Sequence, residues 1–80
     1  MNHRSIAAIA GDIQRKWKNI YFGAVPYLDA MRCLDTIKDS YGMDKADDII
    51  VYFLGNARTF KGPDAVALKD ELKAILKARA

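Results

Sequence analysis

Apolar side chains recur every three or four positions through most of this 80-residue chain, which is the spacing of one face of an α-helix. Gly and Pro interrupt the pattern near residues 23–26, 42 and 62–63, where they are suited to end one helix and begin the next. A chain this short has one modest core. The sequence therefore predicts an all-α fold, one compact helical domain over residues 1–80, with four short helices at about 5–21, 26–40, 44–56 and 63–79.

Each expected helix has a start or stop signal. Ser5 is suited to cap the first helix, and Pro26 suits the first turn of the second. Gly42 is placed to end the second helix in a left-handed conformation, and Asp44 to cap the third. The Gly62-Pro63-Asp64 sequence is expected to open the fourth helix.

The apolar run at residues 49–54 is compatible with a buried strand as well as with a helix. Asp47 and Asp48, just before it, favour a helix because carboxylates stabilise a helix N-terminus. The rest of the chain offers no evident strand to pair with it. We therefore expect a helix here, and its apolar circumference predicts that it is central and touched by the other three.

Some apolar residues fall outside the expected core faces. Leu28 and Tyr52 project from the polar sides of their helices, and Phe22 and Phe60 lie in connectors. If they cluster, Phe22, Leu28, Tyr52 and Phe60 form a candidate protein-binding surface; the alternative for each is ordinary packing or chance exposure. Trp17 lies on the apolar stripe between two lysines and is expected in the core rather than as a stacking platform.

Charge along the chain is basic over residues 1–21, acidic over 22–57 and basic again over 58–80, with a net charge of +3 overall. One explanation is electrostatic fit between packed segments, and the other is a basic face for an anionic partner. If the two terminal helices lie side by side, their basic stripes can merge into a nucleic-acid-binding patch. The alternative is solvated helix faces. The candidate nucleic-acid-binding residues are Arg4, Arg15, Lys18, Lys69, Lys73 and Lys77.

The single cysteine, Cys33, and the single histidine, His3, restrict the chemistry. They provide no internal disulfide, no four-ligand zinc site and no evident nucleophile–base pair. No apolar stretch is long enough to span a membrane, and the apolar part of residues 6–11 is too short for a signal peptide. We expect a cytoplasmic protein that is not an enzyme, with no cofactor and no metal.

Two adjoining runs, residues 12–19 and 21–31, resemble small uncharacterised helical proteins of bacteriophages, prophages and mobile elements. The resemblance continues through residues 50–54, 56–57, Gly62 and 69–76. It implies an accessory protein acting in the bacterial cytoplasm and carries over no functional residues. Together with the missing catalytic groups, it suggests binding to a host or phage protein, for example to inhibit a defence protein, or self-association into a homo-oligomer. Nucleic-acid binding through the terminal helices is the alternative.

Overall fold

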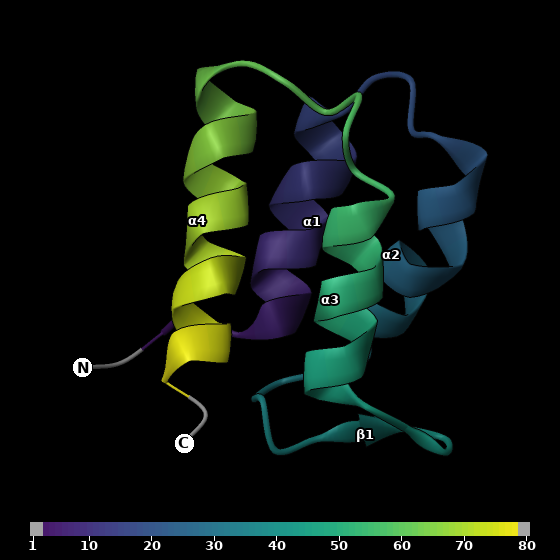
Figure 1. Ribbon diagram of the computed structural model, residues 1–80, viewed down its shortest axis with the longest axis vertical. Coiled ribbons are helices and arrows are strands. Elements are labelled where there is room, and N and C mark those ends of the chain that lie inside the picture. Colours follow the sequence, from purple (N-terminus) through teal and green to yellow (C-terminus); the bar gives the residue numbers. More distant parts are fainter. Residues whose placement is uncertain (1–2, 79–80) are drawn as a thin grey trace.

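The computed structural model describes residues 3–78, and its regular structure is mainly α-helical (Figure 1). This confirms a mainly-α small fold, with the addition of a small two-stranded sheet. In chain order the elements are α1 (Ile6–Lys16), the 3-10 helix η1 (Phe22–Ala24), α2 (Val25–Met31), β1 (Ser40–Tyr41), β2 (Asp44–Lys45), α3 (Ala46–Gly55) and α4 (Pro63–Lys77).

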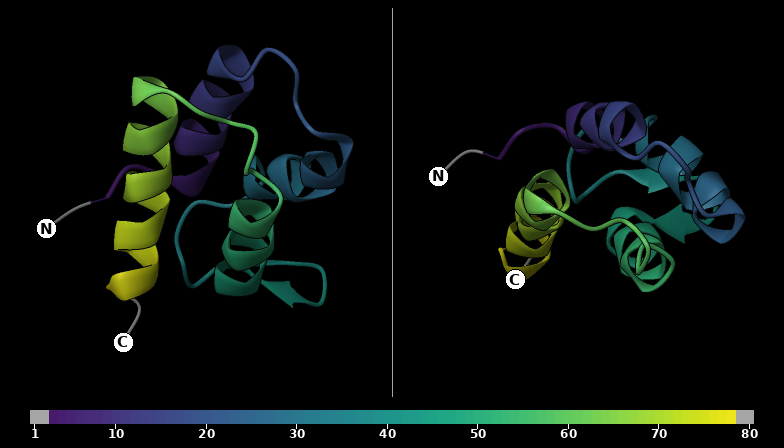
Figure 2. Two further views of the ribbon diagram at one scale, coloured as in Figure 1. Left: turned by 45° about the horizontal axis from the view of Figure 1, so that its top comes forward. Right: turned by 90° about the horizontal axis from the view of Figure 1, so that it is seen from above.

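The four α-helices of residues 3–78 surround a common core (Figure 2). α1 packs against α4 on one side and α2 on the other, and α3 closes the ring between α2 and α4. α3 is therefore not the central helix that its apolar run predicts. It buries one face through Ala46, Ile49, Ile50 and Phe53, while Val51 and Tyr52 are about half exposed.

The core contains an aromatic cluster of Trp17, Phe53 and Phe60. Phe53 is fully buried, and the Trp17 ring lies edge-on to it with a centroid distance of 6.2 Å. Phe60 stacks on Trp17 at 5.1 Å with the ring planes 18° apart. The prediction that Trp17 belongs to the core is confirmed, since only 5% of it is exposed.

α1 begins as expected and ends earlier. The Ser5 hydroxyl accepts a hydrogen bond of 3.0 Å from the Ala8 N–H, which confirms the predicted N-cap. The helix ends at Lys16 rather than near residue 21, because Trp17 adopts an extended conformation (φ −94°, ψ 96°). Trp17 thus leaves the helix while its indole packs between the rings from the other half of the chain.

α2 is much shorter than the predicted 26–40 helix and ends at Met31. The carbonyls of Leu34 and Asp35 instead accept the first N–H groups of α1, from Ala7 at 2.8 Å and Ile6 at 3.0 Å. The Asp39 carboxylate accepts the N–H groups of Asp35 at 2.8 Å and Thr36 at 3.0 Å. Asp and Thr side chains compete in this way with helical hydrogen bonding, so the chain turns where apolar spacing alone predicts a helix.

Gly42 and Asp44, which were predicted to end one helix and cap the next, lie instead in a short hairpin. Ser40 pairs with Lys45 and Tyr41 with Asp44 in antiparallel register. Gly42 has φ 61° and opens the two-residue turn, as type II′ hairpins require. Both predicted roles are wrong: Gly42 turns a hairpin, and Lys45 rather than Asp44 is the N-cap of α3.

The ends of the last two helices agree with the sequence. α3 ends at Gly55 with Asn56 as its C-cap, and α4 has Gly62 as N-cap, Pro63 first and Asp64 in its first turn. α4 ends at Lys77, and residue 79 of the predicted boundary lies outside the described residues. Within residues 3–78, no helix combines the length and the apolar character that crossing a bilayer demands.

Candidate binding surfaces

Two of the four predicted protein-binding residues are buried. Leu28 is 1% exposed and Phe60 3% exposed, so their expected place outside the core is wrong. Leu28 is buried because α2 packs against both α1 and α3 and Leu28 lies on the packed side, whereas its neighbour Asp29 is exposed. Phe60 lies in a connector but is held in the core by its stack on Trp17.

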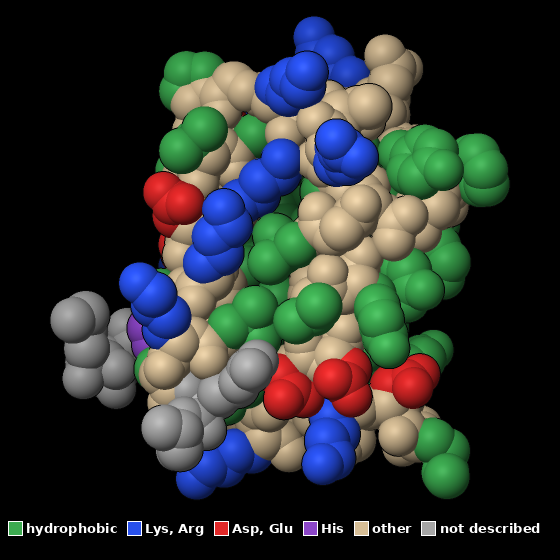
Figure 3. Space-filling model, in the orientation of Figure 1, with side chains coloured by type: hydrophobic (Ala, Val, Ile, Leu, Met, Phe, Trp, Pro, Cys, Tyr) green, Lys and Arg blue, Asp and Glu red, His purple; other side chains and the backbone are tan. Residues whose placement is uncertain are grey.

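The other two residues, Phe22 and Tyr52, are exposed and have aromatic neighbours. Phe22 is 80% exposed, and its ring centroid lies 4.9 Å from that of Tyr21. Tyr52 is 55% exposed and lies 5.7 Å from Tyr27, which is half-buried. We call Tyr21, Phe22, Tyr27 and Tyr52 the aromatic surface. Figure 3 shows hydrophobic side chains gathered over η1, α2 and the adjoining side of α3.

Asn56 and Gly23 join the two aromatic pairs. The Asn56 side-chain amide donates to the Tyr52 carbonyl at 2.9 Å, while its Oδ1 lies 2.9 Å from the point where a Cβ on Gly23 would stand. The same Cβ would stand 2.5 Å from Cε2 of Tyr21. The missing side chain of Gly23 therefore lets Tyr21 lie against α3 beside Asn56. Tyr21 and Tyr27 were not among the predicted residues, although Tyr21 directly precedes Phe22 and Tyr27 follows it by five residues, in α2.

A hollow of about 320 Å³ adjoins the aromatic surface. It is lined by Tyr21, Gly55, Asn56, Arg58 and Thr59. A guanidinium, an amide, a hydroxyl and an aromatic ring thus surround one depression. This combination suits an inserted side chain that brings both apolar surface and a hydrogen-bond acceptor.

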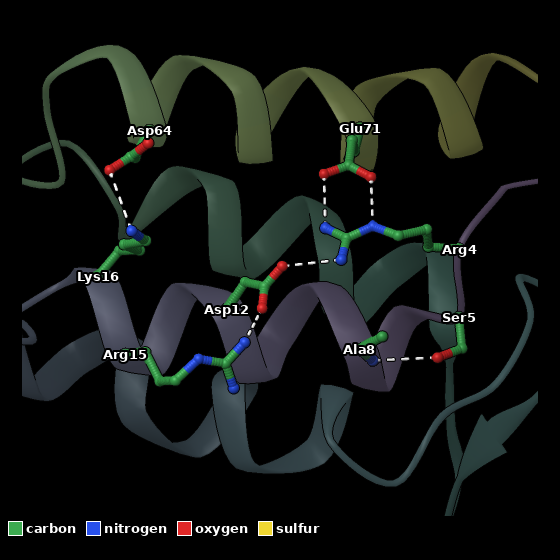
Figure 4. Close-up of polar contacts among 8 residues, drawn as sticks. All are labelled: Arg4, Ser5, Ala8, Asp12, Arg15, Lys16, Asp64 and Glu71. Atoms are coloured by element: carbon green, nitrogen blue, oxygen red, sulfur yellow. Dashed lines mark hydrogen bonds and ion pairs between the residues drawn. The ribbon is translucent and has the colours of Figure 1, made fainter.

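Basic residues in α1 and just before it are neutralised where α1 meets α4 (Figure 4). The Arg4 guanidinium donates two hydrogen bonds of 2.8 Å to the Glu71 carboxylate and a third of 2.8 Å to Asp12. Asp12 also pairs with Arg15, and Lys16 Nζ lies 3.7 Å from the Asp64 carboxylate. The four ion pairs among the described residues therefore lie within or between the two basic segments and do not involve the acidic middle segment.

These contacts change the ionisation of the paired groups. Hydrogen bonds from Arg4 lower the pKa of Glu71, and the Glu71 carboxylate in turn raises the pKa of Arg4. At the end of the 32–39 segment, the N–H groups of Thr36 and Asp35 lower the pKa of Asp39. Each carboxylate is held in its charged form by its donors.

The predicted merging of the two basic stripes does not occur. Glu71 faces α1, and Lys73 is two residues further along α4, which places it about 200° around the helix. Lys69, Lys73 and Lys77 share that other edge, where Figure 3 shows Lys and Arg side chains in a row along α4. Arg4 and Arg15 are engaged by Asp12 and Glu71, and Lys18 is exposed in the turn after α1.

Groups for metal or nucleophilic chemistry do not converge in the described part of the chain. Residues 3–78 hold no cluster of three or more His, Cys, Asp or Glu side chains placed to bind a metal ion. Cys33 is exposed, and its thiol lies 3.8 Å from the Asp29 carbonyl. Two surface features of the described residues gather side chains of one kind: the aromatic surface with its hollow, and the lysine edge of α4.

Compared with known protein families, with curated proteins and with solved structures, the chain shows no match.

Proposed function

We propose that this protein is a non-enzymatic binding module, an accessory protein of a phage or mobile element, that acts in the bacterial cytoplasm by occupying a host or phage protein through its aromatic surface. The observation that carries the proposal is the exposure of Phe22, 80% accessible although its ring already lies against Tyr21. Exposing a phenylalanine forgoes the burial that a small core needs, and exposed aromatic clusters are typical of protein interfaces.

The rest of this surface has the components of an interface centre. Tyr21 and Phe22 form a raised pair, and the hollow beside them offers Arg58 and Asn56 to a partner's acceptor groups. Interface energy concentrates in a few aromatic and arginine side chains around such depressions. Tyr52 and Tyr27 extend the surface along α3 and α2 with further amphipathic rings.

The proposal is tested by substituting Phe22 and comparing the complexes that form. In affinity capture from bacterial lysate, the wild-type protein is expected to retain a discrete partner. The single variants Phe22→Ser and Tyr52→Ser are each expected to lose it. Val66→Ser is the matched control, because Val66 is 59% exposed but lies on α4. For a purified partner, losing a central anchor costs at least about 2 kcal/mol, roughly a 30-fold rise in Kd.

Light scattering of the purified chain distinguishes a second copy from a foreign partner. A wild-type dimer that Phe22→Ser converts to a monomer assigns the aromatic surface to self-association. A strictly monomeric protein that captures nothing, or a partner lost equally with Val66→Ser, overturns the proposal.

A further inference from the structure

Two carboxylates of α4 face α1 and its lysines lie on the other edge, where the third carboxylate, Asp70, is exposed about 60° around the helix from Lys73. Asp64 and Glu71 face α1, where Lys16 and Arg4 pair with them. The opposite edge carries Lys69, Lys73 and Lys77, and Lys61 from the preceding connector lies close enough to act on Lys69. We call Lys61, Lys69, Lys73 and Lys77 the α4 basic row. No carboxylate of residues 3–78 forms an ion pair with any of the four.

We propose that the α4 basic row binds the phosphodiester backbone of a nucleic acid. Successive lysines of the row on α4 are four residues apart, which separates them by about 6 Å along the helix axis and spreads three charges over about 12 Å. A linear set of like charges matches a polymer that carries one phosphate per nucleotide. A single carboxylate engages one of these lysines and leaves the others unmatched.

The row is partly rigid and its charges repel one another. Lys69 Nζ donates a hydrogen bond of 2.6 Å to the Phe60 carbonyl and lies 5.8 Å from the centre of the Phe60 ring. Partial burial lowers the pKa of Lys69, and the neighbouring charges of Lys73 and Lys61 lower it further. Within residues 3–78, Lys69 is therefore held near other lysines with no ion-paired carboxylate, and a bound phosphate would offset that repulsion.

The surroundings of the row favour a narrow polymer over a charged bilayer. On the face shown in Figure 3, carboxylates gather at the start of α3, and further acidic side chains lie at the outer edge of α4. Asp47 and Asp48 lie in the first turn of α3. A flat anionic membrane placed on this face meets these acids as well as the lysines, whereas a nucleic-acid strand can follow α4 and avoid them.

Fluorescence anisotropy with labelled mixed-sequence single-stranded RNA and duplex DNA, across a salt series, tests the proposal. The wild-type protein is expected to bind one or both. The logarithm of its association constant should fall linearly with the logarithm of the salt concentration. Replacing Lys73 and Lys77 together by Ala removes two phosphate contacts, so the slope becomes shallower by about 1.8 for duplex DNA or about 1.4 for a single strand. Whichever of the two polymers binds more tightly shows whether the row prefers single-stranded RNA or duplex DNA.

The matched control replaces Lys38 and Lys45 by Ala, since both are exposed and lie outside α4. It removes the same charge and is expected to leave the slope unchanged. Unbound RNA and DNA at low salt, an equal slope change in the control, or binding only to vesicles of anionic lipid would each overturn the proposal. Phe22→Ser is expected to keep nucleic-acid binding, which separates this site from the aromatic surface.

Discussion

Trp17 stacks on Phe60 at a ring-centroid distance of 5.1 Å, and this contact joins the end of α1 to the connector before α4. Phe53 meets the edge of the same indole from α3. Trp17 thus ties the end of α1 to α3 and to the connector that follows α3. These contacts explain why Trp17 leaves the helical path and why Phe60, in a connector, is buried.

We expect Phe53→Ala to lower the free energy of unfolding by about 3–5 kcal/mol, because it leaves a cavity beside Trp17 that a small core cannot refill. That loss approaches the whole stability of a domain of this size. Chemical denaturation followed by Trp17 fluorescence measures it. Phe22→Ala is the control and should change stability by less than about 0.5 kcal/mol, since Phe22 is mostly exposed. Equal losses in the two variants would contradict the assignment of the core.

Glu71→Gln should reveal that the ion pair between Arg4 and Glu71 makes a pH-dependent contribution to the free energy of unfolding. The native pKa of Glu71 lies below its unfolded value, so the unfolded chain binds the proton more readily. The stabilisation is therefore complete above the ordinary glutamate pKa of about 4.3 and is lost as the pH falls through the lower native pKa.

Both side chains of the pair are partly exposed, so we expect a difference of about 0.2–1 kcal/mol between wild type and Glu71→Gln at neutral pH. The difference should vanish in acid and shrink in high salt. Urea denaturation at several pH values measures it. A difference that grows on acidification is inconsistent with the predicted sign.

Gly42→Ala should destabilise the hairpin by about 1 kcal/mol, because φ 61° is costly for a residue with a Cβ even though the space around it is open. Gly55→Ala provides the matched comparison. Gly55 is the last residue of α3, has ordinary helical φ and also has open space. Thermal unfolding should show Gly55→Ala neutral or stabilising by about 0.5 kcal/mol. A reversed order of the two variants would argue against the hairpin turn.

Gly23→Ala should rearrange the aromatic surface with little effect on the core. The new Cβ displaces the end of the Tyr21 ring and presses on Asn56. We expect large chemical-shift changes at Tyr21 and Asn56 and loss of partner binding comparable to that of Phe22→Ser. In Gly11→Ala the Cβ meets only Arg15 Nη1, at an ordinary 3.6 Å, so that variant should keep binding.

Sequence periodicity predicted the helical segments best where apolar spacing and end signals agree. The Ser5 cap, the Gly62-Pro63 start and the buried stripe of Ile6, Ile9 and Ile13 are confirmed because they depend on neighbours within one or two turns. The helical prediction for residues 32–45 was wrong because their apolar spacing continues while their Asp, Thr and Ser side chains favour turns. The two residues between Tyr41 and Asp44, with Gly first, were the available hairpin signal.

The candidate surfaces were predicted only in part. Phe22 is exposed as its connector position indicates, and Tyr52 as its place on the polar side of a helix indicates. Leu28 and Phe60 are instead buried by neighbours from other segments. Tyr21 joins the surface because Gly23 has no side chain to displace it from beside Asn56, which requires η1 to lie against the end of α3.

The sequence by itself determined where the four helices lie and the apolar faces of α1 and α4, because these properties follow from the spacing of residues a few positions apart. Only the tertiary structure decided which charges are neutralised. Arg4 meets Glu71 because α1 lies beside α4, and the same packing turns the lysines of α4 away from α1. Ion pairing depends on distances of a few ångströms between distant segments, and the pattern of charges along the chain does not specify them.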